Sequence, residues 1–340
     1  MTVPEHAPAD HPSVPDAQIG VLVINLGSPD APETGAVRRY LAEFLSDPRV
    51  IEIPPIAWQP VLRGVILRTR PAKSAKLYDA IWDRERNGSP LKLITQDQAE
   101  ALQTRFPDCR IDFAMRYGTP AIGERLEAMK DAGCERILLL PMYPQYSAAT
   151  TATAVDAANR WMADARWQPA LRTAPPWYDD FAYIDTLAAD LEAQLGALDF
   201  TPDELLISYH GMPKRTLTLG DPYHCQCRKT SRLLSERMNR PLRTVFQSRF
   251  GPAEWLQPYL DKTLEALPGE GVKKVAVAAP AFTADCLETL EEIAVTGREQ
   301  FLGAGGTHFA YLDALNAKPG HIEFLSALID RELAGWRESR

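Results

Sequence analysis

The chain has 340 residues, of which 45% are apolar and 24% charged, a composition typical of soluble globular proteins rather than of disordered or fibrous ones. A net charge of −8 argues against a nucleic-acid partner, because binding phosphates requires a concentrated cationic face. The five cysteines are odd in number and include no CxxC pair, so the sequence indicates neither a disulfide framework nor a zinc ribbon. At this length two domains are expected.

Residues 1–17 are rich in proline, alanine, histidine and aspartate, and have neither the basic nor the apolar region of a signal peptide. We predict that they form a disordered tail. No apolar run approaches the roughly 18 to 20 residues that span a bilayer, which leaves peripheral contact as the only membrane option. The cysteine usage favours a reducing compartment, and we expect a cytoplasmic protein.

Predicted strands and helices alternate along the chain. We expect strands at residues 19–26, 110–118, 136–142, 171–178, 204–209, 243–249, 273–279 and 307–313, and helices at 35–45, 51–67, 91–106, 119–132, 149–166, 179–196, 228–238, 253–267, 286–302 and 320–336. Because the strands are almost continuously apolar, the pattern predicts an α/β fold whose parallel sheets are covered by helices on both faces. Two sheets of about four strands each fit the length better than one larger sheet.

The segment 51–67 is unusually apolar, with basic residues at position 63 and, just after the segment, at 68 and 70. One interpretation is a core helix flanked by cations. The alternative is an apolar lip that touches a substrate or a membrane surface.

Polar and aromatic residues follow the predicted strands, where open parallel sheets bind their ligands. They are Asn25 and Ser28, Arg116 and Tyr117, Tyr143 and Tyr146, Ser208 and His210, residues 247–249, and Thr283 and Asp285. Loop polarity explains any one of these groups, but six together predict a site.

His210 follows an apolar strand and has the side chain best suited to general base catalysis near neutral pH. A lone histidine is more often structural, so the case depends on its neighbours. Neither a GxSxG nucleophile elbow nor a P-loop is present, which argues against hydrolase and nucleotide chemistry. Arg116 and Tyr117, with other arginines and tyrosines, suit a flat, anionic, aromatic ligand.

A row of carboxylates opens the predicted helix 286–302. Asp285 and Glu288 have the spacing of a capping box, and plain helix initiation is one explanation of this pattern. Glu288 and Glu292, however, are spaced i and i+4, where like charges destabilise a helix by a few tenths of a kcal/mol. Such a row is better explained if it faces a metal ion or transferred protons.

The chain resembles the ferrochelatase family, in its Gram-negative bacterial type, over nearly all of residues 19–335. The resemblance rests on motifs that occur in the family's order: INLGSP, NGSP, MRYG, YPQYS, SYHGMP, GDPY, QSRFGPAEWLQPY and PAFTADCLETLEEI. It implies the class II chelatase fold, with two Rossmann-like domains that each hold a mainly parallel four-stranded sheet. The first would comprise 18–145 with 315–340 and carry the porphyrin lip, and the second 146–314 with the catalytic histidine.

The resemblance also implies roles for individual residues. His210 and Glu288 would be catalytic, with His210 acting as proton acceptor or metal ligand, and Glu288 and Glu292 would bind or conduct metal or protons. The residues implied to hold the porphyrin are Leu26, Tyr78, Ser89, Arg116 and Tyr117. Asp285 and Ser208 would support the site.

The activity implied is insertion of Fe²⁺ into protoporphyrin IX, with no cofactor beyond the iron substrate. A [2Fe–2S] cluster is not expected, because Ala148 and a cysteine-free C-terminal tail occupy the positions of the family's cluster ligands. Cys286 stands where many eukaryotic members have histidine. We expect a monomer, with transient contact at the inner membrane as an option. The rivals are a chelatase for coproporphyrin or sirohydrochlorin and a non-catalytic tetrapyrrole carrier, and the role of Cys225 and Cys227 is open.

Overall fold

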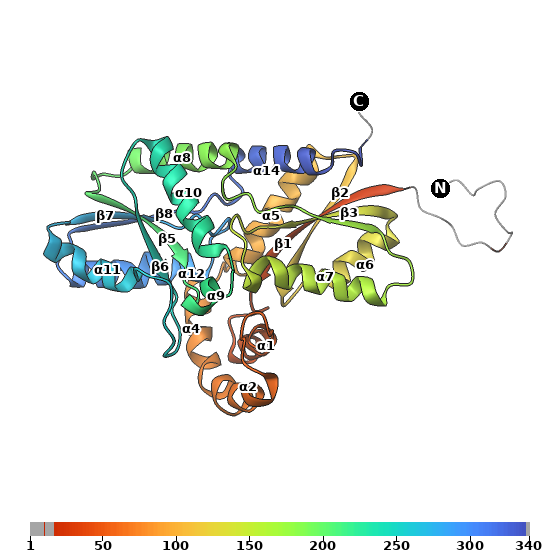
Figure 1. Ribbon diagram of the computed structural model, residues 1–340, viewed down its shortest axis with the longest axis horizontal. Coiled ribbons are helices and arrows are strands. Elements are labelled where there is room, and N and C mark those ends of the chain that lie inside the picture. Colours follow the sequence, from red (N-terminus) through yellow and green to blue (C-terminus); the bar gives the residue numbers. More distant parts are fainter. Residues whose placement is uncertain (1–9, 11–16, 338–340) are drawn as a thin grey trace.

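The structure is a computed structural model that describes residue 10 and residues 17–337. Almost all of the predicted tail, 1–17, lies outside the described residues. The described chain forms two four-stranded sheets, side by side (Figure 1). The first has the order β2-β1-β3-β4 and consists of β1 (Gln18–Gly27), β2 (Cys109–Tyr117), β3 (Cys134–Pro141) and β4 (Ala170–Thr173).

The second sheet has the order β6-β5-β7-β8 and consists of β5 (Glu204–His210), β6 (Arg243–Gln247), β7 (Lys274–Ala278) and β8 (His308–Leu312). Neighbouring strands are parallel in both sheets. The predicted α/β fold with two four-stranded parallel sheets is therefore confirmed.

Helices connect the strands. In the first half of the chain they are α1 (Thr34–Phe44), α2 (Pro55–Val61), α3 (Leu67–Thr69), α4 (Pro71–Ile81), α5 (Pro90–Arg105), α6 (Ile122–Asp131) and α7 (Thr153–Asp164), with π-helical turns η1 (Leu62–Ile66) and η2 (Ala148–Ala152). In the second half they are α8 (Phe181–Gly196), α9 (Lys214–Thr218), α10 (Tyr223–Met238), α11 (Leu260–Ala266), α12 (Leu287–Leu290), α13 (Arg298–Gly303) and α14 (Pro319–Glu332), with the 3₁₀ turn η3 (Leu267–Glu270) and the π-helical turn η4 (Glu292–Gly297).

Strand β1 is buried on both faces because its alternate side chains enter different cores. Val21 and Val23 join a core that includes Leu102 of α5, whereas Leu22 and Ile24 pack in a second core with α6 and α7. The first of these cores continues through β5, β7, α8 and α14, so the two sheets share one continuous apolar interior. This double burial explains the uninterrupted apolar run in the sequence of β1.

The observed sheets differ from the predicted division of the chain at residue 145. Strand β4 pairs with β3, with Arg136 opposite Ala170 and Leu139 opposite Thr173. The first sheet therefore extends to residue 173, and helix α7 also belongs to it through its contacts with α6. The sequence predicts a strand near residue 171, but the periodicity of its side chains does not specify which strand it pairs with.

The C-terminal segment ties the two halves together. Helix α14 packs on α5 of the first half and on α8 of the second, along one side of the molecule (Figure 1). Beyond α14, Arg337 pairs with Asp108, which precedes β2, at 2.6 Å. The described part of the C-terminal segment thus contacts the first half of the chain, and the predicted assignment of 315–340 to the first domain stays a prediction. Within the described part of the chain, no helix combines the length and apolar character needed to cross a membrane.

The segment predicted as one helix at 51–67 forms α2, η1 and α3, which project from the body with α1 and α4 (Figure 1). Leu62 and Leu67 are buried, whereas Ile56 is 89% exposed and Val65 54%. We call residues 53–70 the lip. Its mixed exposure differs from that of a core helix and matches the alternative of an exposed apolar edge.

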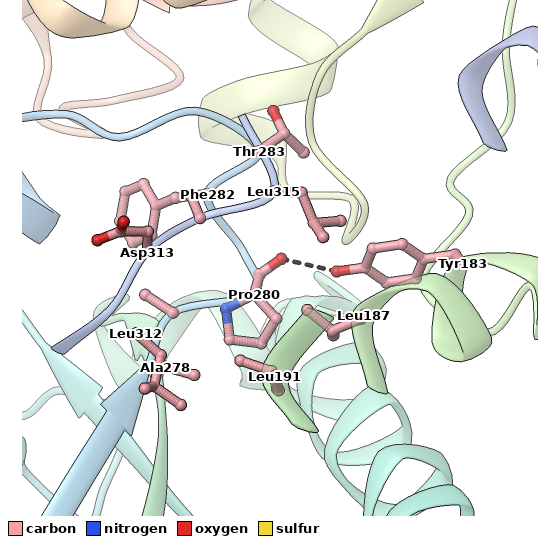
Figure 2. A pocket seen from close by; sticks show the side chains of 12 residues that line it. Tyr183, Leu187, Leu191, Ala278, Pro280, Phe282, Thr283, Leu312, Asp313 and Leu315 are labelled. Atoms are coloured by element: carbon pink, nitrogen blue, oxygen red, sulfur yellow. Dashed lines mark hydrogen bonds between the residues drawn. The ribbon is translucent and has the colours of Figure 1, made fainter. Parts of the chain in front are cut away.

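A small cavity lies where β7 approaches α8 (Figure 2). It is lined mainly by aliphatic side chains, including Leu187 and Leu191, and the Tyr183 hydroxyl donates a hydrogen bond to the Pro280 carbonyl at 2.8 Å on one side. Its volume of about 10 Å³ has room for one water molecule at most. We therefore regard it as a packing feature and place the site elsewhere.

Candidate active site

Several of the predicted site residues follow the strands at which the strand order of each sheet reverses. In the second sheet β6 lies on one side of β5 and β7 on the other. Sheets with such a reversal bind ligands in a crevice beyond the carboxyl ends of the two strands at the switch point, here β5 and β7. His210 is the last residue of β5, and the segment after β7 leads to Asp285 and Glu288. In the first sheet the corresponding crevice lies beyond β1, where Leu26 is found.

The hydrogen bond of His210 identifies its tautomer. Nδ1 lies 2.7 Å from the carbonyl oxygen of Gly211, which can only accept, so Nδ1 carries the proton. In the neutral imidazole Nε2 is then the acceptor, and it makes no hydrogen bond to any described residue. Gly211 itself donates to the Gln247 carbonyl at 2.7 Å, and a Cβ atom at residue 211 would lie 2.5 Å from that oxygen. Only glycine permits this close approach, which holds His210 in place.

Glu292 is the second titratable group of the site. Ser248 donates to its carboxylate from the backbone nitrogen, at 2.7 Å, and from the hydroxyl, and Gln247 Nε2 donates at 3.2 Å. Burial raises the pKa of Glu292 above its ordinary value. The hydrogen bonds from Ser248 and the positive charge that His210 carries when protonated oppose the rise, and the charge of Glu288 adds to it. A carboxyl group with a raised pKa exchanges protons closer to neutral pH.

The prediction of one regular helix over 286–302 is wrong. The carboxylate row lies on α12 and the π-helical turn η4 instead. After α12 the chain makes the π-helical turn η4, where the Glu291 carbonyl accepts from the backbone nitrogens of Val295 at 3.2 Å and Thr296 at 2.9 Å. Such insertions are frequent at functional sites. The Glu291 carboxylate accepts from the Thr296 hydroxyl at 2.8 Å, while Glu292 faces β6 through Ser248.

Three of the five predicted porphyrin-binding residues line one narrow cavity together with Glu288. Leu26, Tyr78 and Ser89 form its walls, and its volume is about 10 Å³. A tetrapyrrole does not fit this volume, so the walls must separate for one to enter. The lip also contacts the second half of the chain, where the Arg70 guanidinium carbon lies 3.9 Å from the centroid of the Phe250 ring.

Arg116 and Tyr117 do not line the narrow cavity, and both contact Asp47. The Arg116 guanidinium forms a buried ion pair with Asp47, and the Tyr117 hydroxyl donates to the same carboxylate at 3.0 Å. The guanidinium carbon also lies 4.2 Å from the centroid of the Tyr117 ring. Both side chains are buried, so their predicted contact with a porphyrin stays a prediction and requires rearrangement around Asp47.

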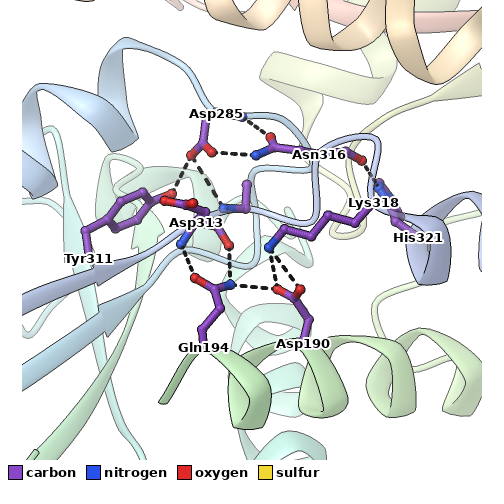
Figure 3. Close-up of polar contacts among 9 residues, drawn as sticks. Asp190, Gln194, Asp285, Tyr311, Asp313, Asn316, Lys318 and His321 are labelled. Atoms are coloured by element: carbon purple, nitrogen blue, oxygen red, sulfur yellow. Dashed lines mark hydrogen bonds and ion pairs between the residues drawn. The ribbon is translucent and has the colours of Figure 1, made fainter. Parts of the chain in front are cut away.

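Asp285 is the centre of a buried hydrogen-bond network (Figure 3). Its carboxylate accepts from the hydroxyls of Tyr311 at 2.7 Å and Thr289 at 2.9 Å and from Asn316 Nδ2 at 2.7 Å. Thr289 lies on α12, one residue from Glu288, so the network fixes the helix that carries Glu288. The predicted supporting role of Asp285 therefore has a plain physical basis. The network continues through Asn316 to His321, whose Nδ1 lies 2.6 Å from the Asn316 carbonyl oxygen.

Ser208, the other predicted supporting residue, acts through Gln247. Its hydroxyl donates to Gln247 Oε1 at 2.7 Å, and Gln247 Nε2 donates to the Glu288 carbonyl at 2.8 Å. Ser208 and Gln247 are buried and connect β5 to the carboxylate-bearing segment.

The structure does not assemble His210, Glu288 and Glu292 into one cage. Among the residues it describes, no group of three or more histidine, cysteine, aspartate or glutamate side chains is arranged to hold a metal ion. Burial also raises the pKa of the Cys286 thiol well above its ordinary value, so this residue is protonated at neutral pH and is not a ready thiolate ligand. The predicted metal-binding roles of the three residues stay predictions.

Sequence reasoning placed residues 247–249 at the predicted site without identifying the group that they hold, and it missed Asp47. Gln247 and Ser248 position Glu292, and Asp47 pairs with Arg116. Ser248 has a positive φ of 61°, a backbone conformation that is uncommon for residues other than glycine and that aims its nitrogen at Glu292. The polar run QSR at the end of a predicted strand was visible in the sequence, but it did not indicate that Glu292 is the partner of Gln247 and Ser248.

Comparison with known proteins decides the family. The ferrochelatase family model matches residues 18–333. The chain belongs to the ferrochelatase family. A ferrochelatase of Allorhizobium ampelinum is 51% identical over 337 residues, which cover 97% of this chain and 98% of that protein. One from Rhodopseudomonas palustris is 50% identical over 342 residues, covering 99% of each. The resemblance inferred from the motifs is therefore confirmed.

Solved structures with the same architecture lie much further away in sequence. SirB from Bacillus subtilis with Fe³⁺ superimposes with a TM-score of 0.56 at 11% identity, covering 94% of this chain and 97% of that one. The sirohydrochlorin chelatase SirB from B. subtilis subspecies spizizenii, in complex with cobalt, gives 0.52 at 10% identity, covering 93% and 94%. At these identities the likeness concerns the fold, and it confirms the expected class II chelatase architecture for this ferrochelatase family member.

Proposed function

We propose that this protein inserts Fe²⁺ into protoporphyrin IX and releases two protons, forming protohaem. The observation that carries the proposal is the free Nε2 of His210 at the crevice of a ferrochelatase family member. An imidazole with its Nδ1 proton already donated to a carbonyl accepts a proton at Nε2 without changing tautomer. Membership of the family supplies the tetrapyrrole and the iron, which geometry alone does not specify.

The difficulty of the reaction is geometric. The free porphyrin is flat and carries two N–H groups, so its nitrogens are not all open to the metal at once. A cleft that fits a bent macrocycle better than a flat one stabilises the transition state over the ground state. In our proposal His210 accepts pyrrole protons, and Glu288 and Glu292 carry metal or protons. The raised pKa of Glu292 supports its proton role.

The function is tested with purified protein, Fe²⁺ under anaerobic conditions, and three tetrapyrroles offered separately. We expect the highest kcat/KM with protoporphyrin IX, lower values with coproporphyrin and sirohydrochlorin, and loss of porphyrin fluorescence as metal enters. A coproporphyrin or sirohydrochlorin preference would replace the substrate we propose. Stoichiometric binding of porphyrin without metal insertion would identify a carrier instead.

The remaining expectations on cofactor and partners stay predictions. We propose that the reaction needs no cofactor beyond its iron substrate and no [2Fe–2S] cluster. We also propose that the protein is a cytoplasmic monomer without a nucleic-acid partner. The net charge of −8 supports the last point.

We further propose that the lip touches the inner membrane surface. Ile53, Ile56, Val61 and Val65 are exposed apolar side chains on this one projection, and Arg63 and Arg68 flank them. Apolar side chains near cations are suited to a surface of anionic lipid, where burial and charge attraction add. Such a contact would place the cleft beside the phase in which an apolar tetrapyrrole dissolves.

Replacing Ile56 and Val65 together with aspartate is expected to weaken binding to anionic vesicles about ten-fold or more, because two apolar anchors are lost and two anionic charges are added. The measurement is co-sedimentation with vesicles of two parts phosphatidylethanolamine and one part phosphatidylglycerol. Phe181→Asp serves as the control, since Phe181 is 76% exposed on α8, away from the lip. Equal vesicle binding by wild type and lip variant would refute the membrane contact.

A further inference from the structure

Of the histidines that the structure describes, His321 is the one that is fully buried. It lies in the first turn of α14, the helix that packs on α5 of the first half and on α8 of the second. Its ring stacks on that of Trp177, with the centroids 6.3 Å apart and the planes 19° from parallel. The chemistry proposed for the site does not use this side chain, so its burial calls for another explanation.

The two ring nitrogens of His321 have different surroundings. Nδ1 lies 2.6 Å from the Asn316 carbonyl oxygen, which can only accept, so Nδ1 carries the proton. Nε2 is buried and has no hydrogen-bond partner among the described residues. A neutral imidazole leaves only an acceptor there, whereas a protonated one would place a buried N–H group and a positive charge there without an acceptor.

The charged groups around His321 do not compensate a positive charge on its ring. Asp190 of α8 is already paired with Lys318, with distances of 2.8 and 2.9 Å from Nζ to the two carboxylate oxygens. Helix α5 contributes the uncharged Gln98 to this junction, and Asp285 lies beyond it, bound to its own donors. Burial therefore lowers the pKa of His321 to about 4, although the hydrogen bond to the carbonyl and the charge of Asp190 oppose the fall.

Asn316 connects His321 to the candidate active site (Figure 3). Its side chain donates to the Asp285 carboxylate at 2.7 Å and accepts from the Asp285 backbone nitrogen at 2.8 Å. Its backbone has a positive φ of 48°, and its carbonyl is held by His321 and by Gln98 Nε2, at 3.1 Å. Because Asp285 also binds Thr289 of α12, the position of the carboxylate row depends on this junction.

We propose that His321 is a pH-sensitive positioning residue, whose neutral imidazole holds Asn316 and the Asp285 network in place and whose protonation in acid releases them. The proton is accommodated once the segment 313–321 opens and the ring reaches water. An opened histidine binds its proton with the ordinary pKa of about 6.5, whereas the closed one has a lower affinity for protons. Opening therefore becomes more favourable as the pH falls below about 6.5, and above that pH the stabilisation is fully present. This release is a property of the fold, and only its effect on metal insertion rests on the proposed function.

The test is amide hydrogen exchange of the full-length protein at pH 7.5 and 5.5, corrected for the intrinsic pH dependence of exchange. In the wild type we expect the protection of residues 285–291 and 314–322 to fall about ten-fold at pH 5.5, which is one unit below the pKa of an opened histidine. In His321→Asn the fall should be much smaller, because the amide keeps a donor near the position of Nδ1 and cannot gain a charge. His308→Asn, which removes an exposed histidine, should behave as the wild type.

Metal insertion provides the second readout. The ratio of the rates at pH 5.5 and 7.5 should be higher in His321→Asn than in the wild type. An equal fall of protection in both proteins would overturn the proposal. A nitrogen-15 NMR titration of the wild-type histidines requires no variant, and it should show one imidazole that keeps an unprotonated Nε2 at pH 5.5. Protonation of every imidazole of the folded protein at that pH would also overturn the proposal, whereas the expected exchange in a protein that inserts no metal would contradict only the proposed function.

Discussion

Replacing His210 with alanine is expected to lower the rate of metal insertion by about 10² to 10⁴-fold, the usual contribution of a positioned general base. The free Nε2 at the end of β5 disappears, and no other histidine side chain lies at this crevice among the predicted site residues. The measurement is Zn²⁺ insertion into protoporphyrin IX, followed by fluorescence. Porphyrin binding, measured by quenching of tryptophan fluorescence, should change little.

His308→Ala is the matched control, because His308 is exposed at the start of β8, the opposite end of the sheet from the crevice. It should retain wild-type activity. Comparing Zn²⁺, Co²⁺ and Fe²⁺ then distinguishes the two roles of His210. A base serves every metal alike, so the loss should be the same for all three, whereas a ligand would give a loss that varies with the metal. Full turnover in His210→Ala would refute both roles.

Asp285→Ala is expected to destabilise the protein by about 3 to 5 kcal/mol, because it leaves the buried donors of Tyr311, Thr289 and Asn316 without their acceptor. The thermal unfolding midpoint should fall accordingly. Since Thr289 lies on α12, metal insertion should fall as well, even at temperatures where the variant remains folded. The role is one of positioning, because Asp285 acts on Glu288 through the helix.

Two further variants serve as the control and as the conservative replacement for this prediction. Asp199→Ala removes an exposed carboxylate with no partner among the described residues and should change stability by less than about 0.5 kcal/mol. Asp285→Asn keeps one acceptor oxygen, so it should be less destabilising than the alanine variant. If Asp285→Ala unfolded at the wild-type temperature and kept full activity, the network would have no role in holding α12.

Most of the elements could be predicted from the chain, and the sequence also indicated a candidate location for the site. Val21 to Ile24 are apolar without interruption because β1 faces a core on each side, and such a run is visible in any single sequence. Polar residues after strand ends point to the crevice for a similar reason, since parallel strands end on the same edge. The pairing of β4 with β3 was not predictable, because a short strand of four residues has no local feature that names its partner.

The backbone conformation of the segment after Asp285 also could not be predicted from the local sequence. An i and i+4 pattern assumes a regular α-helix, and the π-helical turn at Glu292 breaks that assumption. Ser248 and Gln247 hold the Glu292 carboxylate from a different strand, 44 and 45 residues away in the sequence. Contacts at such separations depend on how sheets and helices pack, and periodicity carries no information about them.

By itself the sequence determined the α/β class, the two sheets and the family, and it predicted His210, Glu288 and Glu292 as the chemical groups of the site. These follow from apolar patterning and from motifs, which are local properties of the chain. Only the tertiary structure decided that neutral His210 presents a free Nε2, that burial raises the pKa of Glu292, and that Arg116 is bound to Asp47. The physical reason is that protonation, burial and ion pairing depend on neighbours that lie far apart in the sequence and meet only in the folded chain.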